Sequence, residues 1–210
     1  MNTSTFVGTI AAIAALSLPV NADWTEDGGA ITFETPQDVV ITISQTPGYP
    51  QGNGKYKINS ANLKQVCLAL TMGRILQKNP AINVTVFVRN DGVYLVDENM
   101  LDYISARQPS DESPPSNFRS LPPCVIPDEN GVPHYFTLKD HLDAFLNDDD
   151  NNLVNCPICA AARGFIDATG VPVDGYPYAG ILPLPTSTDW GDVKSAIPSM
   201  LMGADKFIDF

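Results

Sequence analysis

Two short β-branched runs, separated by a helical pattern, are the feature that most limits how this chain can fold. Residues 38–44 and 82–88 are almost continuously apolar and β-branched, which is typical of buried parallel strands. Between them, Asn59 or Ser60 can cap a helix. The apolar face of that helix, spaced i, i+3, i+4, i+7, is Leu63, Val66, Cys67 and Leu70. A strand, a helix and a strand of this kind predict a parallel βαβ unit.

The rest of the chain continues the alternation of strands and helices. We expect helices at 93–104, from about 138, and at 188–201, and strands at 152–155, 171–176 and 206–210. Thr137 and Asp140 have the spacing of a capping box at the start of the second helix. The fold class predicted is α/β, an open parallel sheet of about five strands with helices on both faces.

A proline-rich segment interrupts this pattern. Residues 105–134 contain seven prolines together with Ser, Asp and Asn, which indicates an irregular surface insertion. Residues 23–210 are otherwise short enough to form a single domain that carries this insertion.

The first 22 residues have the character of a secretory signal peptide. They are uncharged, apolar from Phe6 to Val20, and end in the small-x-small pattern Val20-Asn21-Ala22. They lack the usual Lys or Arg before the apolar run, which leaves a buried N-terminal helix as the alternative. The run is shorter than the ~20 residues of a membrane span. We therefore expect a periplasmic or secreted protein that has no membrane anchor once the leader is cleaved.

The charge balance excludes one class of partner. Twelve Lys and Arg residues against 24 Asp and Glu give a net charge of −12, so binding to the phosphates of nucleic acid is not expected. Four cysteines are too few for a disulfide-dense scaffold, and each has to be interpreted separately.

The segment Cys156-Pro157-Ile158-Cys159 is the main candidate for chemistry. It follows the strand expected at 152–155, which places Cys156 at the N-cap of a helix and Pro157 at its first position. We expect Cys156 to emerge into solvent there, with a thiolate stabilised by backbone N–H groups and Cys159 within reach. Arg163 lies about two helical turns further on, and either orients an anionic sulfur species or is a solvated charge.

Other interpretations of the cysteines remain open. A structural zinc site needs four ligands, and Cys67, Cys124, His134 and His141 show no matching pair spacing; neither a metal nor another cofactor is predicted. A purely structural disulfide within the motif is a further possibility. Cys67 is expected to be a small buried hydrophobe. Cys124 is expected to be a loop cysteine, with a third thiol folded over the site as the alternative.

Three further features are interpreted as structural. His141 lies on an apolar helix face and is expected to be a core histidine. Residues 148–152 are dense in oxygen ligands but lack the spacing and glycine of a calcium loop, so a solvated turn is expected. Three tyrosines near the predicted strand ends either line a crevice at the carboxyl ends of the strands or simply pack in the core. They are Tyr94, Tyr176 and Tyr178.

The cysteine segment also resembles that of the DsrE/DsrF-like sulfur-relay family. In Cys156-Pro157-Ile158-Cys159-Ala160-Ala161-Ala162-Arg163-Gly164, as in that family, the cysteine follows a strand, precedes an Ala-rich turn, and lies eight residues before a glycine that follows a basic residue. Residues 84–94 are similar to the family's second strand and Gly-Val turn, which contains Gly92 and Tyr94. Residues 205–210 resemble its final strand.

The resemblance implies a flavodoxin-like sheet, a homo-oligomer, and a cysteine that carries sulfane sulfur as a persulfide. That role falls to Cys156; Cys159 is the resolving thiol by proximity, and Arg163, Gly92 and Tyr94 are the expected substrate-binding residues. The partner would be a small sulfur species or a sulfur-carrier protein. Whether the chain is an enzyme stays open; if it is, a sulfurtransferase is expected. The alternatives are a thiol-disulfide redox module and a non-catalytic binding or assembly subunit.

Overall fold

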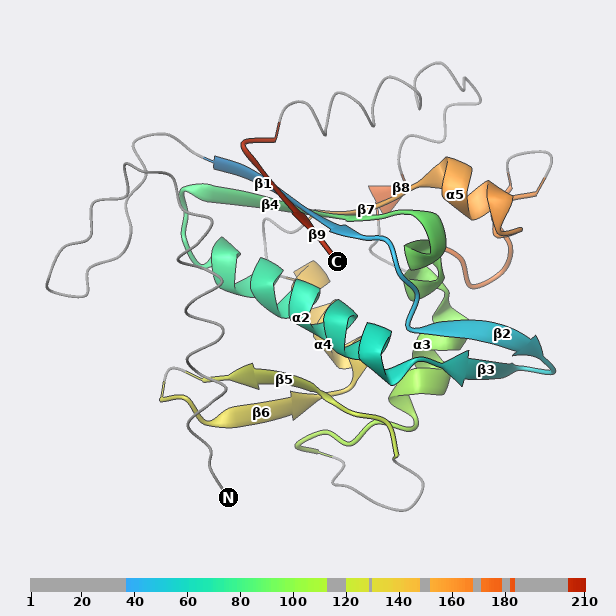
Figure 1. Ribbon diagram of the computed structural model, residues 1–210, viewed down its shortest axis with the longest axis horizontal. Helices are drawn as coiled ribbons and strands as arrows, with labels where there is room; N and C mark the ends of the chain where they lie inside the picture. Colours follow the sequence, from blue (N-terminus) through green and yellow to red (C-terminus); the bar gives the residue numbers. More distant parts are fainter. Residues whose placement is uncertain are drawn as a thin grey trace, which may run out of the picture.

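A five-stranded parallel sheet organises the chain in the computed structural model (Figure 1). The structure describes residues 37–112, 120–128, 130–147, 152–167, 171–178, 182–183 and 204–210. The strands lie in the order β8-β7-β4-β1-β9, and every neighbouring pair is parallel. Their bounds are β1 Gln37–Ile43, β4 Ile82–Val88, β7 Asn152–Asn155, β8 Leu182–Pro183 and β9 Lys206–Asp209. The predicted α/β fold class is confirmed.

The order in which the chain adds strands to the sheet changes direction beside β1. From β1 the chain adds β4, β7 and β8 in one direction, and β9 then pairs with the opposite edge of β1. Ligand crevices of open parallel sheets lie where the order reverses, which here is between β1 and β9. The loop that follows β7, which contains the cysteine pair, does not lie at that point, because β4 separates β7 from β1.

Alternation along the central strands divides the apolar side chains between two faces. Ile41 and Ile43 join the main core, whereas Val40 and Phe87 belong to a smaller cluster on the other face. Successive side chains of a strand point to opposite faces, so both faces of β1 and β4 are apolar. The short β-branched runs therefore form buried central strands, as predicted.

Two helices cover one face of the sheet (Figure 1). Helix α2, Ser60–Gln77, begins at the N-cap Asn59, whose side chain accepts hydrogen bonds from the backbone N–H groups of Ala61 and Asn62. Helix α4, Leu138–Asn147, begins at the predicted capping box. Thr137 N–H and Oγ1–H both donate to the carboxylate of Asp140, and Asp140 N–H donates to Thr137 Oγ1.

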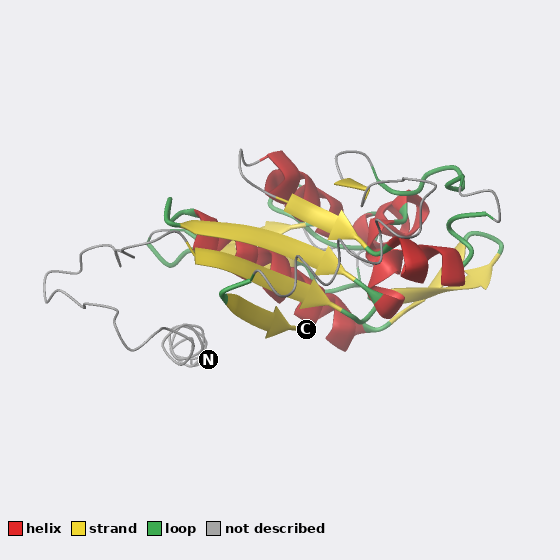
Figure 2. Ribbon diagram, turned by 90° about the horizontal axis from the view of Figure 1, so that it is seen from above, coloured by secondary structure: helices red, strands yellow, loops and turns green. Residues whose placement is uncertain are grey.

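The stretch after β4 forms two short helices instead of the one expected at 93–104. The 3₁₀ helix η1 spans Asn90–Val96 and α3 spans Glu98–Ser105. They are separated at Asp97, whose extended backbone and side chain, accepting from Asn99 N–H, cap α3. The second view shows helices gathering at the arrowhead end of the sheet (Figure 2), and η1 begins directly at the carboxyl end of β4.

The proline-rich insertion contains an antiparallel hairpin, where the sequence suggested only irregular structure. Strands β5, Cys124–Pro127, and β6, Pro133–Phe136, pair with each other and lie on the side of α2 and α4 away from the sheet (Figure 1). A disulfide between Cys67 of α2 and Cys124 of β5 joins this hairpin to the core, with 5.1 Å between the Cα atoms. Cys67 is therefore buried, as expected, but it is bonded to Cys124, and the expectation that Cys124 is merely a loop cysteine was wrong.

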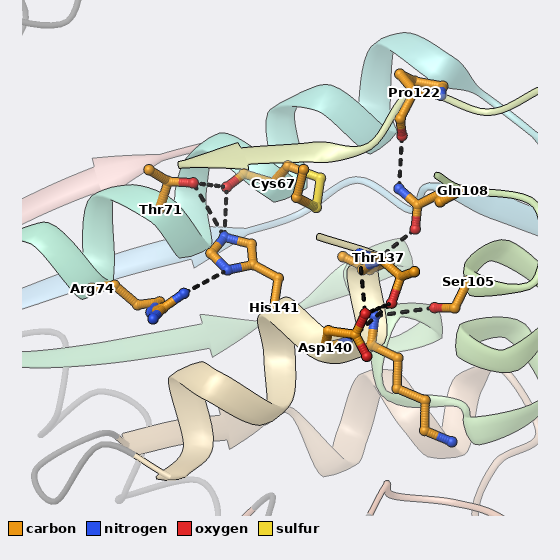
Figure 3. Close-up of a disulfide and its surroundings, with 12 residues drawn as sticks. Cys67, Thr71, Arg74, Ser105, Gln108, Pro122, Thr137, Asp140 and His141 are labelled. Atoms are coloured by element: carbon orange, nitrogen blue, oxygen red, sulfur yellow. Dashed lines mark hydrogen bonds between the residues drawn. A yellow bond between two sulfur atoms is a disulfide. The ribbon is translucent and has the colours of Figure 1, made fainter. Parts of the chain in front are cut away.

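Buried Gln108 provides a second tie for the insertion. Its side-chain NH₂ donates to the carbonyl of Pro122 at 2.7 Å, and its side-chain oxygen accepts from Leu138 N–H at 2.6 Å (Figure 3). One amide thus satisfies a carbonyl of the insertion and an unpaired N–H group in the first turn of α4.

His141 is a core histidine, as predicted, and it lies beside the buried disulfide (Figure 3). Its Nδ1 is 3.3 Å from the Arg74 guanidinium, which can only donate, so Nδ1 is the acceptor. Its Nε2 is therefore protonated, and it lies 3.1 Å from Thr71 Oγ1 and 3.3 Å from the carbonyl of Cys67. Burial and then the neighbouring Arg74 charge lower the pKa of His141 to about 4.

Two further sequence expectations failed near turns. The strand expected at 171–176 is only an isolated bridge between Ile166 and Pro172, followed by a turn with Gly175 at φ +77°; β8 supplies the strand next to β7. A hairpin of β2, Gly48–Gly52, and β3, Lys55–Ile58, was not expected at all.

Some expectations fall on residues outside the described part of the chain. They are the leader at 1–22, the helix at 188–201 and most of the acidic turn at 148–152. Among the described helices, none combines the length and apolarity that a membrane crossing requires.

Replacing Cys67 and Cys124 together by Ala should lower the free energy of unfolding by about 2 to 4 kcal/mol, because the bond restricts a long loop of the unfolded chain. Urea unfolding of the double variant and of wild type, both followed by circular dichroism, measures the difference. The matched double variant, in which Cys156 and Cys159 are replaced by Ala, should lose less free energy of unfolding, since that bond closes only a short loop. Equal midpoints for wild type and the first variant would contradict the assigned role.

Stability should fall as the pH is lowered from about 6.5 to about 4, since the folded protein binds the His141 proton more weakly than the unfolded chain does. The loss attributable to His141 should reach about 3 kcal/mol. His141→Gln keeps a side-chain donor but does not titrate, so its unfolding free energy should depend less steeply on pH. Parallel pH dependences of wild type and variant would contradict this assignment.

Candidate functional site

The sheet delivers Cys156 to the start of a helix in the predicted way. Its backbone N–H donates to the Val88 carbonyl at 3.0 Å, which continues the β7–β4 ladder by one residue. Helix α5, Pro157–Ala162, follows, with Cys156 as the N-cap and Pro157 in the first turn. The backbone N–H of Cys159 donates to Cys156 Sγ at 3.3 Å. The predicted placement of both cysteines in one helical turn is therefore present.

The two sulfurs of this segment are bonded to each other. Cys156 and Cys159 form a disulfide with 5.3 Å between their Cα atoms, so all four cysteines of the chain are paired. A disulfide that a thiolate can reach is opened and closed by thiol–disulfide exchange, which is the chemistry that this arrangement allows.

The environments of the two cysteines differ. Cys156 is only 4% exposed and packs against Val40, Phe87 and Val93. Cys159 lies at the edge of the same cluster and is partly exposed. The expectation that Cys156 emerges into solvent was wrong, because η1 folds Val93 over the strand end. Cys159 is the more accessible residue of the pair.

Gly92 has a structural reason to lie in this turn. A side chain there would collide with the backbone carbonyl of Ile43 at the end of β1. Its N–H group donates to the carbonyls of Ser44 and Arg89. This close approach of η1 to β1 places the next residue, Val93, against Cys156. The contact of Gly92 with substrate stays a prediction.

The Arg163 guanidinium is engaged with a carboxylate of η1. Its Nε–H donates to Asp91 Oδ1 at 2.7 Å, and Tyr49 Oη–H donates to Asp91 Oδ2 at 2.8 Å. Partial burial acts to raise the pKa of Asp91, but the hydrogen bonds from Tyr49 and Arg163 hold it below its ordinary value. The network ties the end of α5 to η1 and to β2, so the predicted contact of Arg163 with a sulfur anion would compete with Asp91.

Aromatic rings form a continuous row between these elements. Tyr94 lies between Tyr49 and Phe165, with ring centroids 5.9 and 5.1 Å away, and Phe165 stacks on Tyr176 at 4.3 Å. Phe165 also packs against the cluster that contains Cys156. Tyr94 and Tyr176 were expected from the sequence to line a crevice or to pack, whereas Tyr49 and Phe165 were not expected here. The third tyrosine, Tyr178, instead donates to Asp143 of α4.

A second arginine at the strand ends points away from the cysteines. Arg89, directly after β4, pairs with Asp209 of β9 at 3.1 Å. Asp209 also accepts from the Thr42 hydroxyl of β1, and this hydrogen bond, together with Arg89, lowers the pKa of Asp209. The arginine therefore bridges β4 and β9 across β1, on the side of β4 opposite to β7.

The described residues offer no metal centre. Within the ranges that the structure covers, no three or more His, Cys, Asp or Glu side chains are grouped to hold a metal ion. Cys67 and Cys124 are bonded to each other, so in this state they cannot complete a zinc site with the Cys156–Cys159 pair.

Comparisons with known proteins connect the chain to others through structure. No protein-family model and no curated protein matches it. Its structure is similar to the crystal structure of the ychN protein from E. coli, a DsrE/DsrF-like protein, with 12% sequence identity and a TM-score of 0.41, over 84% of this chain and 100% of that chain. At this identity the likeness concerns the fold alone, and the chemistry has to be argued from the chain's own residues.

Proposed function

We propose that this chain is an exported sulfur-relay or sulfurtransferase-type protein whose working group is the Cys156–Cys159 pair. The observation that carries the proposal is a pair of sulfurs in bonding contact at the start of α5, at the carboxyl edge of a parallel sheet. Such a pair can accept sulfur, release it, and return to its starting state by thiol–disulfide exchange.

In the reduced pair, the Cys156 thiolate attacks the outer sulfur of a persulfide donor R–S–SH. The donor S–S bond breaks, R–S⁻ leaves and takes up a proton from solvent, and Cys156 carries the sulfur as Cys156–S–SH. The Cys159 thiolate then attacks Cys156 Sγ, hydrosulfide leaves, and the disulfide forms. The two cysteines supply the two electrons that reduce the sulfane sulfur to sulfide. Alternatively, a partner thiolate takes the outer sulfur and restores Cys156.

The packing around Cys156 favours a small donor. With Cys156 only 4% exposed, the bulk of a protein thiol is excluded, whereas a persulfide or polysulfide presents a narrow end. The hydrogen bond from Cys159 N–H to Cys156 Sγ would stabilise the attacking thiolate. Small sulfur species, or a carrier protein that presents one on an extended arm, are therefore the proposed partners.

Export is part of the proposal. The apolar, uncharged residues 1–22 support a leader peptide, and a buried Cys67–Cys124 disulfide is typical of proteins that fold in oxidising compartments. Mass spectrometry of the protein recovered from a periplasmic or secreted fraction tests this: an N-terminus near Asp23 is expected. Retention of Met1 in the mature, fully folded protein would exclude cleavage.

A homo-oligomer is also proposed. Edge strand β9 carries Phe207, which is 50% exposed, and an apolar residue on an exposed strand edge favours association. Light scattering at several concentrations tests this, and a mass that stays that of one chain rules it out.

The proposal predicts that polysulfide adds sulfur to Cys156. Reduced Cys159→Ser, which cannot resolve a persulfide internally, should gain mass in steps of about 32 Da on treatment with polysulfide. Cys156→Ser, with the other cysteines as in wild type, is the matched control and should gain far less. Intact-mass spectrometry after removal of excess reagent gives the result. Equal addition to both variants, or to neither, would reject a persulfide on Cys156.

A second candidate function is a thiol-disulfide redox module, which the bonded state of Cys156 and Cys159 favours. It predicts that the pair cycles, so its reduction potential should lie near that of an oxidising compartment, roughly −120 to −210 mV. Equilibration with glutathione buffers, with alkylation of free thiols as readout, measures it. A potential far below this range leaves the bond permanently closed and rejects cycling.

A third candidate is a non-catalytic binding or assembly subunit. The β5–β6 hairpin presents three exposed apolar residues, Val125, Val132 and Tyr135, which a partner protein can cover. Here Cys156→Ser should leave the cellular phenotype intact, while replacing the three hairpin residues by Ser should abolish it. The opposite pattern would reject this candidate.

A further inference from the structure

We propose that the oxidised pair is reopened by attack on Cys159, with Cys156 as the leaving thiolate. This inference rests on the proposed function, because it concerns the step that returns the disulfide to the dithiol. It assigns the two cysteines to different partners: Cys156 receives sulfur from a small donor, and Cys159 receives the reducing thiol.

Burial separates the two sulfur-bearing residues. Cys156 is enclosed by Val40 and Phe87 of the sheet and by Val93 of η1. Cys159 lies one helical turn further on and is partly exposed, directly after Ile158, which is 41% exposed. A thiol on a bulky molecule therefore meets Cys159 first, with an apolar side chain beside it to contact.

The direction of displacement agrees with this access. A thiolate that opens a disulfide approaches one sulfur from the side opposite the other. For attack on Cys159 that side faces away from the buried Cys156. Cys156 is buried within the cluster of Val40, Phe87 and Val93, whereas Cys159 lies only at its edge, so the approach to Cys156 is the more obstructed one.

The leaving sulfur is the better stabilised of the two. Cys156 Sγ accepts the backbone N–H of Cys159 at 3.3 Å, and a hydrogen bond to the developing thiolate assists its departure. Within the part of the chain that the structure covers, no equivalent donor to Cys159 Sγ is found among the hydrogen bonds. Cleavage therefore places the negative charge on the sulfur that has a donor.

The step is balanced with a dithiol as reductant. One thiolate of the dithiol bonds to Cys159 Sγ, the Cys159–Cys156 bond breaks, and its electron pair goes to Cys156 Sγ, which later takes a proton. The second thiolate of the dithiol attacks its own partner sulfur, and Cys159 leaves as thiolate. The dithiol is oxidised by two electrons and the protein pair is reduced by two.

Two single variants test the assignment with a large and a small reagent. Reduced Cys156→Ser presents only Cys159 of the pair, and reduced Cys159→Ser presents only Cys156. Each is reacted with 5,5′-dithiobis(2-nitrobenzoate), which is bulky, and with iodoacetamide, which is small. For each variant, the rate constant with 5,5′-dithiobis(2-nitrobenzoate) is divided by the rate constant with iodoacetamide, which removes differences in thiolate content. For Cys159 this ratio should exceed that for Cys156 by about tenfold or more, given their access.

Trapping on the wild-type protein gives an independent readout. The oxidised chain is mixed with excess glutathione, quenched with acid, and the adduct is located by fragmentation within the peptide that carries both cysteines. The expected adduct is on Cys159. An adduct mainly on Cys156, or a rate ratio that is equal or reversed, would overturn the inference. Intact mass and circular dichroism confirm that the Cys67–Cys124 bond and the fold persist in both variants.

The outcomes separate this inference from the proposed function. Glutathione on Cys159 without sulfur uptake from polysulfide by Cys156 would support the direction of reopening and reject sulfur relay. Sulfur uptake by Cys156 with the glutathione adduct also on Cys156 would support sulfur relay and reject the direction of reopening.

Discussion

The hydrogen bond from the Cys156 amide to the Val88 carbonyl fixes the geometry on which the site depends. It extends the parallel pairing of β7 and β4 one residue past the strand end, so the first residue of the α5 turn is held by the sheet. Parallel strands keep a strict side-chain alternation, and Cys156 therefore joins Phe87 on the same face. A slip of one residue would send the sulfur to the opposite face and away from Val93.

The two disulfides have different physical roles because their surroundings differ. Cys67 and Cys124 are both buried between α2 and the β5–β6 hairpin, beside the neutral His141, and their bond joins segments 57 residues apart. Cys156 and Cys159 share a single helical turn at the edge of the sheet, and one of them is partly exposed. Reagents in solution can therefore reach the second pair while the first remains a constraint on the fold.

Much of the architecture could be predicted because it is local. β1, β4, the Asn59 cap and the Thr137–Asp140 box follow from spacing over a few residues, and so does the start of α5 at Cys156. The β2–β3 hairpin was also within reach of local reasoning: Asn53 and Gly54 both have positive φ, and an Asn-Gly pair is a strong hairpin signal. It was missed because the surrounding Pro and Gly residues were interpreted only as a boundary.

The errors concern contacts between distant segments. No local pattern connects Cys67 with Cys124, or indicates that η1 covers Cys156 and that Asp91 pairs with Arg163. The strand expected at 171–176 failed because the β propensity there is overridden by the turn at Asp174 and Gly175, which leaves only a bridge at Pro172. The position of the cysteine pair at a helix start could thus be predicted from sequence, whereas the exposure of the two cysteines and the charge partner of Arg163 depend on tertiary packing.

The most direct test of the central claim is sulfide release. Purified wild type, Cys156→Ser and Cys159→Ser are each supplied with polysulfide and a dithiol reductant, and sulfide is measured over the uncatalysed background. Multiple turnovers by wild type, with release reduced to background by Cys156→Ser and strongly lowered by Cys159→Ser, are the results the account predicts. Release by Cys156→Ser at the wild-type rate would contradict it.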